Sequence, residues 1–230
     1  MINYCLPIIE REAEFVRELI DRSRADYHFI EIWLDYIQEL DPFFVEELAA
    51  SLGSRLIFLF RRQGLDKIQM PLESRYRIIY KISESASFLD LDLTTQVEEL
   101  DYIRREGLSP KLILSYHNYI ETPDWPVLRK LAVTMRRNRA TVCKVACMCN
   151  SPEDAVRLLT LQMEFRKNAV RHIVLGMGGY GAVTRIFGTL WGNEMIFAPS
   201  SHQSESAPGQ LTQGELAQIF KILEGQNGRK

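Results

Sequence analysis

Hydrophobic and polar positions along the chain alternate between two kinds of segment. Short runs rich in β-branched and apolar residues are separated by longer stretches in which apolar residues recur at helical spacing. The short runs predict eight strands, at residues 4–9, 28–34, 55–60, 88–93, 111–116, 140–146, 172–177 and 194–198. The longer stretches predict helices at about residues 11–24, 42–52, 71–84, 95–106, 124–138, 151–167, 180–190 and 212–224. This alternation is typical of parallel α/β proteins.

Two of the predicted helices carry strong start signals. Asp41 precedes Pro42, and Ser151 precedes Pro152, so each pair offers a capping side chain followed by proline at the first helical position. Eight strand–helix pairs within 230 residues fit a (β/α)8 TIM barrel, near the short end of its range of roughly 200 to 400 residues. We therefore expect a single compact domain over residues 1–230. A doubly wound open sheet is the alternative arrangement.

Composition and charge restrict the class of protein further. The chain is 46% hydrophobic, which is enough apolar material for one sizeable core. A formal net charge of −2 and a pI near 6.1 provide no general electrostatic footprint for nucleic acid or an anionic membrane. The first residues do not resemble a signal peptide, and no stretch approaches the ~18 apolar residues of a membrane span. We expect a cytoplasmic protein that acts on a small molecule.

The four cysteines are Cys5, Cys143, Cys147 and Cys149. So few cysteines in a chain of this size are typical of reduced thiols that pack as small hydrophobic side chains. A Cys-x-Cys pair without a histidine or a second cysteine pair at ligand spacing is a weak zinc pattern. The sequence therefore predicts no metal site.

Polar side chains gather where the predicted strands end. In a barrel the active site lies at the carboxyl ends of the strands. Glu31 and Trp33 share one side of the second predicted strand, and Arg61 and His117 directly follow the third and the fifth. Lys144 lies within the sixth. These residues are the first candidates for a site.

Lys144 and His117 are the candidate catalytic residues. A charged lysine inside an apolar strand is costly, so desolvation and nearby cations would favour a free amine that attacks carbonyls. The alternative is a lysine that reaches solvent or pairs with a carboxylate. His117 suits general acid–base catalysis near neutral pH. Its alternative is a capping histidine beside Asn118.

Two further segments lie near the carboxyl end of the chain. Four glycines between residues 176 and 181 precede Arg185, but their spacing matches neither a Walker loop nor a dinucleotide fingerprint. Arg185 could bind a carboxylate through two hydrogen bonds, although a surface arginine is equally consistent with its position. Residues 199–212 are long and polar for a connection in a compact domain, which is typical of an active-site lid or of a disordered loop. Polar composition alone does not distinguish the two.

The order of these segments resembles the type I 3-dehydroquinate dehydratases over essentially the whole chain. Residues 114–118, with Thr122-Pro123, resemble the family's Ser-x-His-Asp/Asn segment and its Thr-Pro. Residues 143–148 resemble the family's Lys-(Ile/Val)-Ala strand, and residues 177–185 resemble its arginine segment. Residues 206–210, Ser-Ala-Pro-Gly-Gln, resemble its closing loop.

The resemblance implies a barrel lyase of the shikimate pathway that dehydrates 3-dehydroquinate to 3-dehydroshikimate without a metal or cofactor. It implies that Lys144 forms a Schiff base with the substrate and that His117 is the general acid and base. It also implies a set of residues that contact the substrate: Glu31, Arg61, Arg185, Ser206 and Gln210. A homodimer is common in the family. A continuation into a shikimate dehydrogenase half, as in some relatives, is left open.

Two positions depart from the family pattern. Trp33 stands where the family's Glu-x-Arg-x-Asp segment has arginine. After the third strand, the family glutamate that orients the catalytic histidine is missing, so either Gln63 takes its place or the role is unfilled. We therefore expect His117 to lack an anionic neighbour. These departures keep open a catalytically weakened barrel that binds a polyol carboxylate, and a Schiff-base aldolase would share the strand lysine.

Overall fold

The predicted strands form in the computed structural model, which describes residues 2–227. They are β1 (Tyr4–Ile8), β2 (Phe29–Trp33), β3 (Leu56–Leu59), β4 (Phe88–Asp92), β5 (Lys111–Asn118), β6 (Val142–Met148), β7 (His172–Met177) and β8 (Ile196–Phe197). All paired strands are parallel, and the order in the sheet is β7-β6-β5-β4-β3-β2-β1-β8. Because β1 pairs with β8, the first and the last strand of the chain are neighbours in the sheet.

The seam between β7 and β8 is closed by side-chain as well as backbone contacts. The backbone N of Glu194 donates to the carbonyl of His172 at 2.8 Å. The Asn193 side chain accepts a hydrogen bond from the backbone N of Val174 and donates one to its carbonyl, both at 2.9 Å. The result is a nearly closed barrel, which confirms the predicted fold and excludes the open doubly wound sheet.

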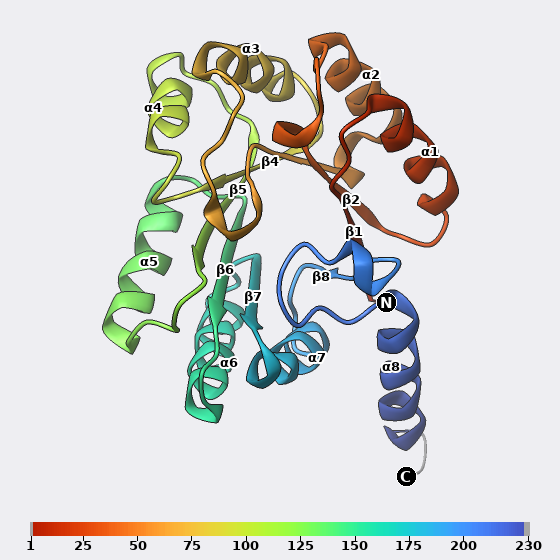
Figure 1. The fold of residues 1–230 in the computed structure, drawn as a ribbon. Coiled ribbons are helices and arrows are strands. Elements are labelled where there is room, and N and C mark those ends of the chain that lie inside the picture. The colour runs from red at the N-terminus through yellow and green to blue at the C-terminus, as the bar shows by residue number, and fades with distance from the viewer. Residues whose placement is uncertain (1, 228–230) are drawn as a thin grey trace.

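Helices surround the strands on the outside, as Figure 1 shows. They are α1 (Ala13–Ser23), α2 (Pro42–Leu52), α3 (Leu72–Ser83), α4 (Val97–Arg105), α5 (Trp125–Arg137), α6 (Pro152–Lys167), α7 (Ala182–Leu190) and α8 (Gln213–Asn227). Asp41 accepts from the backbone N of Phe43, and Ser151 forms a capping box with Asp154, so both predicted helix starts are confirmed. Short 3-10 turns also follow β2 and β3 (η1, Leu34–Tyr36; η3, Gln63–Leu65).

Two strands run further than the apolar pattern predicts. β5 continues to Asn118 and β6 to Met148, because Asn118 pairs with Cys147 and Met148 pairs with Met177. The polar His117 and Asn118 resemble loop residues in the sequence, yet the ladder with β6 holds them in extended backbone. His117 is therefore positioned by a strand.

The barrel interior is apolar at the amino ends of the strands and polar at their carboxyl ends. Side chains at the strand starts, such as Cys5, Ile57 and Phe88, belong to one buried apolar cluster. Outward-facing residues such as Cys143 and Val145 belong to the larger cluster between strands and helices. Since side chains alternate along a strand, Lys144 faces the lumen. All four cysteines are buried free thiols.

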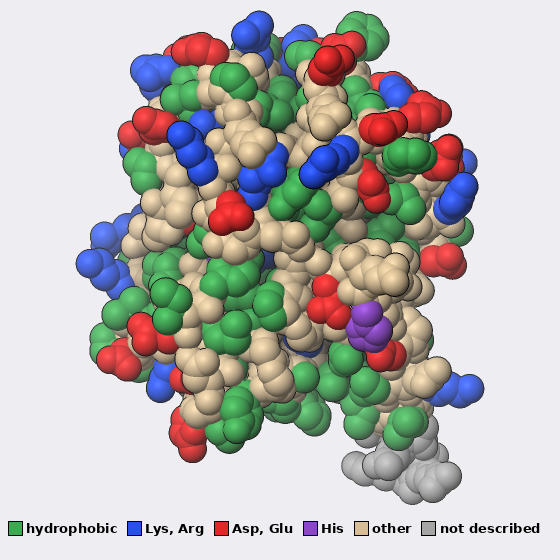
Figure 2. Space-filling view, in the orientation of Figure 1, with side chains coloured by type: hydrophobic (Ala, Val, Ile, Leu, Met, Phe, Trp, Pro, Cys, Tyr) green, Lys and Arg blue, Asp and Glu red, His purple; other side chains and the backbone are tan. Residues whose placement is uncertain are grey.

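The surface and the helices of residues 2–227 show no sign of a membrane span or a metal site. On the face shown in Figure 2, Lys and Arg side chains are interspersed with Asp and Glu. None of the helices in this part of the chain is both long and apolar enough to cross a bilayer. No group of three or more His, Cys, Asp or Glu side chains there could hold a metal ion.

Candidate active site

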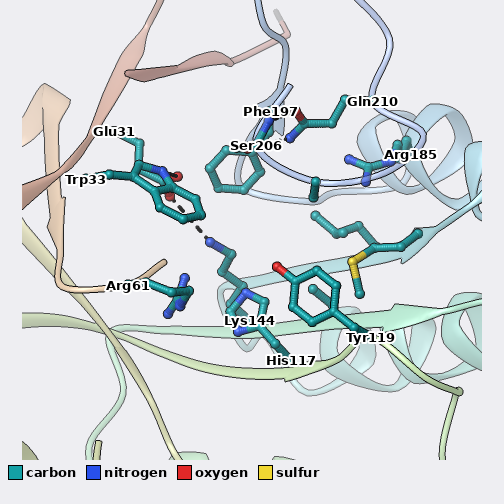
Figure 3. A pocket seen from close by; sticks show the side chains of 14 residues that line it. Glu31, Trp33, Arg61, His117, Tyr119, Lys144, Arg185, Phe197, Ser206 and Gln210 are labelled. Atoms are coloured by element: carbon teal, nitrogen blue, oxygen red, sulfur yellow. Dashed lines mark hydrogen bonds and ion pairs between the residues drawn. The ribbon is translucent and has the colours of Figure 1, made fainter. Parts of the chain in front are cut away.

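One pocket at the carboxyl ends of the strands brings all seven predicted site residues together (Figure 3). They come from β2, β5, β6, α7 and the loops after β3 and β8: Glu31, Arg61, His117, Lys144, Arg185, Ser206 and Gln210. All seven are buried, so the pocket concentrates charged groups away from bulk water. Trp33 and Tyr119 line the same pocket.

The amine of Lys144 lies between two carboxylates. Its Nζ is 2.8 Å from Asp90 Oδ2 and 3.4 Å from Glu31 Oε2, and it lies 4.3 Å from the centre of the Phe197 ring. The side chains of Lys144 and Asp90 are only 5% and 0% exposed. Lys144 thus points into the pocket and ends in an anionic cradle.

This cradle corrects the expectation that burial leaves Lys144 as a free amine. Burial does disfavour the charged form, but Asp90 and Glu31 outweigh it and raise the pKa of Lys144 above its usual value. The positive charges of Arg61 and Lys144 hold the pKa of Asp90 well below its usual range, despite its burial. The resting pair is therefore an ammonium and a carboxylate.

Asp90 also organises the neighbouring strands. Its Oδ1 accepts hydrogen bonds from Arg61 Nη2 at 2.7 Å and from Ser115 Oγ at 2.6 Å. Arg61 Nη2 also donates to Ser115 Oγ at 2.9 Å. One buried carboxylate therefore connects the end of β3, β5 and β6 beneath the pocket.

His117 has an anionic neighbour, contrary to the expectation from the missing glutamate. Its Nδ1 lies 2.9 Å from Asp92 Oδ2, at the end of β4. Asp92 Oδ1 is itself held by the backbone N and hydroxyl of Thr94 and by the backbone N of Thr95. Because an ionised Asp92 can only accept, the proton lies on Nδ1 and Nε2 keeps a free lone pair.

The charge on the His117 ring is set by opposing neighbours. Burial and the positive charge of Arg61 lower the pKa of His117 to about 4, although the hydrogen bond to Asp92 acts in the other direction. Asp92 has its own pKa lowered by the His117 hydrogen bond, against the effect of burial. At neutral pH the pocket thus holds a neutral imidazole.

Gln63 does not occupy the place of the orienting glutamate. It is exposed, its side chain donates to the carbonyl of Glu205 at 2.9 Å, and its backbone N donates to the Tyr36 hydroxyl. The alternative in which Gln63 takes the glutamate's place is therefore excluded, because the loop after β3 turns toward residues 199–212, here called the lid segment. Gln63 instead links the loop after β3 to the lid segment through its hydrogen bond to Glu205.

Arg185 is a buried cation without a carboxylate partner in the described part of the chain. Its Nε and Nη1 have no hydrogen-bond partner there, and Nη2 donates only to the Pro208 carbonyl at 3.4 Å. Burial lowers the pKa of Arg185 to about 10, so the guanidinium remains charged at neutral pH. An unpaired buried charge is costly, which makes this end of the pocket a receptor for an anion.

The helix that carries Arg185 reaches the pocket through a close backbone approach. A Cβ on Gly181 would lie 2.3 Å from the carbonyl carbon of Gly176 at the end of β7. Only glycine permits this approach, which brings the first turn of α7 against the strand. The glycine-rich turn therefore positions Arg185.

The lid segment folds across the mouth of the barrel beside β1 and β8 (Figure 1). Gln210 Oε1 accepts from the backbone N of Ser206 at 2.8 Å, and Gln210 Nε2 donates to Ser206 Oγ at 2.9 Å. Gly209, with φ of +76°, packs against the Gly178 backbone. These contacts place both predicted lid residues at the pocket.

Trp33 supplies a neutral donor where the family pattern has a cation. Its Nε1 donates to Glu31 Oε1 at 2.9 Å. Its ring also packs edge to face against Tyr36, with centroids 6.1 Å apart. Trp33 thus orients Glu31, whose other oxygen contacts Lys144.

Asp90 and Asp92 are the site residues that sequence reasoning missed. They alternate with apolar residues in Phe88-Leu89-Asp90-Leu91-Asp92, and both are fully buried. Two acids at period-two spacing in an apolar strand are a signal of lumen-facing charge.

Comparisons with known proteins identify the family of the chain. The sequence profile of the type I 3-dehydroquinase family matches residues 4–227. The chain is 32% identical to the 3-dehydroquinate dehydratase of Aromatoleum aromaticum, over 96% of this chain and 89% of that protein. It is also 32% identical to the enzyme of the same name from Pyrococcus abyssi, over 96% of this chain and 94% of that protein.

A solved structure gives the same result for the fold. The crystal structure of 3-dehydroquinate dehydratase from Geobacillus kaustophilus superimposes with a TM-score of 0.82 at 28% identity, over 98% of this chain and 92% of that one. The chain belongs to the type I 3-dehydroquinase family.

Proposed function

We propose that the protein dehydrates 3-dehydroquinate to 3-dehydroshikimate through a Schiff base on Lys144. The observation that carries the proposal is the buried amine of Lys144 between Asp90 and Glu31, in one pocket with His117 and the unpaired Arg185. The family and the names of its members support the substrate.

The anionic cradle suits imine formation because the charge at the nitrogen is conserved. An ammonium and a ketone condense to a protonated imine and water, so one positive charge is present before and after. Asp90 and Glu31, which stabilise the ammonium, also stabilise the iminium. The iminium withdraws electrons from the adjacent C2–H bond, and no metal or nicotinamide is needed as an electron sink.

His117 is the proton carrier in this proposal. Its neutral Nε2 removes the C2 proton, and the electron pair of the C–H bond moves toward the iminium to form an enamine. A histidine with a low pKa is a modest base but a strong conjugate acid. The imidazolium therefore returns its proton readily to the C1 hydroxyl, which leaves as water.

The remaining polar groups hold the substrate. Arg185 binds its carboxylate, since Nε and Nη1 lack partners among the described residues. Glu31, Arg61, Ser206 and Gln210 contact hydroxyl groups, and the lid segment excludes water. Hydrolysis of the imine then releases the product.

Covalent capture tests the proposal. Borohydride added during turnover of 3-dehydroquinate, without added metal or cofactor, is expected to reduce the imine and attach substrate mass to Lys144. Appearance of dehydroshikimate absorbance in parallel distinguishes an enzyme from a barrel that only binds polyol acids. A label on Lys67, Lys81 or Lys111 would overturn the assignment.

The lid segment provides a second prediction. Substrate must enter beneath residues 199–212, so this segment has to open and close during turnover. Hydrogen exchange measured by mass spectrometry is expected to slow in residues 199–212 when product saturates Arg185. The helices α3 and α4, far from the lid in the ring of helices, serve as internal controls. Equal protection with and without product would contradict the lid role.

A further inference from the structure

Tyr119 is a polar group in the pocket that the proposed mechanism leaves without a role. It lines the pocket with Lys144 and His117, and its hydroxyl makes no hydrogen bond to any residue that the structure describes. In Figure 3 the Tyr119 hydroxyl points into the pocket, on the side where the Lys144 amine lies.

The backbone fixes this orientation. Side chains alternate along β5, so Ser115 and His117 face the lumen. Tyr119, the first residue after β5, lines the same pocket. Tyr119 packs against the lumen cluster, whereas Tyr116 packs against the cluster between strands and helices. After the strand, Asn118 Oδ1 accepts from the backbone N of Ile120 at 2.9 Å and of Glu121 at 3.0 Å. This turn holds the Tyr119 backbone in place.

The electrostatic surroundings make Tyr119 a donor. Burial raises the pKa of the phenol, against the opposing effects of Arg61 and Lys144, so the hydroxyl keeps its proton at neutral pH. The ring lies nearly parallel to the His117 imidazole, with centroids 6.4 Å apart and planes 18° apart. A neutral O–H group with a restrained ring is therefore available to an oxygen atom near Lys144.

We propose that the Tyr119 hydroxyl donates a hydrogen bond to the ketone oxygen of the substrate while Lys144 attacks the carbonyl carbon. This inference rests on the proposed Schiff-base function. The Lys144 ammonium first gives one proton to a neighbouring carboxylate, Asp90 or Glu31. The freed Nζ lone pair forms the N–C bond, and the π pair of the C=O bond moves to the oxygen. The carboxylate returns that proton to the oxygen, a second proton from the same nitrogen follows, and the oxygen leaves as water. Tyr119 stabilises the negative charge on the oxygen and transfers no proton in the balance.

The test measures imine formation apart from proton abstraction. The probe is 3-dehydroshikimate, the product, whose ketone can condense with Lys144. Sodium borohydride traps the adduct, and intact-protein mass spectrometry follows its rate of appearance at saturating probe. Tyr119→Phe keeps the ring and removes the donor, so trapping is expected to slow by about 10²-fold, as for loss of one oxyanion donor.

Tyr116→Phe is the matched control. Tyr116 lies in β5, three residues before Tyr119, but its hydroxyl accepts from Asn118 outside the lumen at 3.3 Å. Trapping by Tyr116→Phe is therefore expected at the wild-type rate. Equal rates in Tyr119→Phe and wild type would overturn the inference while leaving the proposed function intact. Equal slowing in both variants would also overturn it, because the effect would then be structural. If the wild type forms no adduct on Lys144, the proposed function and this inference both fail.

Discussion

Replacement of Lys144 by methionine is expected to abolish dehydration. Methionine approximates the length of the lysine side chain but cannot form an imine, so kcat should fall by about 10⁴-fold or more, as for loss of a catalytic nucleophile. Dehydroshikimate formation measures the loss, and borohydride should attach no substrate mass. Lys111→Met is the control, because Lys111 is exposed at the opposite end of the barrel.

The same substitution affects the folded state. It leaves the buried Asp90 and Glu31 without their shared cation, and removing one partner of a buried ion pair costs about 3–5 kcal/mol. Thermal unfolding therefore has to accompany the assay. A folded Lys144→Met protein that retains a tenth of the wild-type kcat would exclude the Schiff-base mechanism.

Replacement of His117 by glutamine is expected to separate proton transfer from imine formation. Loss of a general acid–base group lowers kcat by about 10²- to 10⁴-fold. Lys144 and its carboxylates remain, so borohydride should still capture the substrate on Lys144. A variant that loses capture together with turnover would place His117 in imine formation instead.

The pH profile of the wild type tests the ionisation of His117. Its pKa is lowered to about 4, so the ring is neutral above that value and charged below it. A reaction that needs the neutral base is therefore active above pH 4 and declines as the pH falls through it. Asp92→Asn removes the contact that raises this pKa, so the decline should move to lower pH. A limb at higher pH in Asp92→Asn would mean that another group controls it.

Much of the architecture follows from local pattern. Alternating apolar runs and helical stretches predict the barrel, because strands and helices bury faces of different period. A lysine within an apolar strand identifies Lys144 as unusual, since charge is costly there. The order of the motifs along the chain, through the resemblance to the family, predicts that Arg185, Ser206 and Gln210 contact the substrate. The structure places all three at the pocket.

What the tertiary structure alone decides is the partner of each charged group. Asp90 reaches Lys144 across β5, and Asp92 reaches His117 from the neighbouring strand, at distances that no spacing along the chain encodes. Whether a buried group is charged depends on its distance from neighbouring charges, because Coulomb interactions between buried groups can outweigh desolvation. The sequence therefore determines which residues face the lumen. The fold determines that Lys144 rests as an ammonium and His117 as a neutral base.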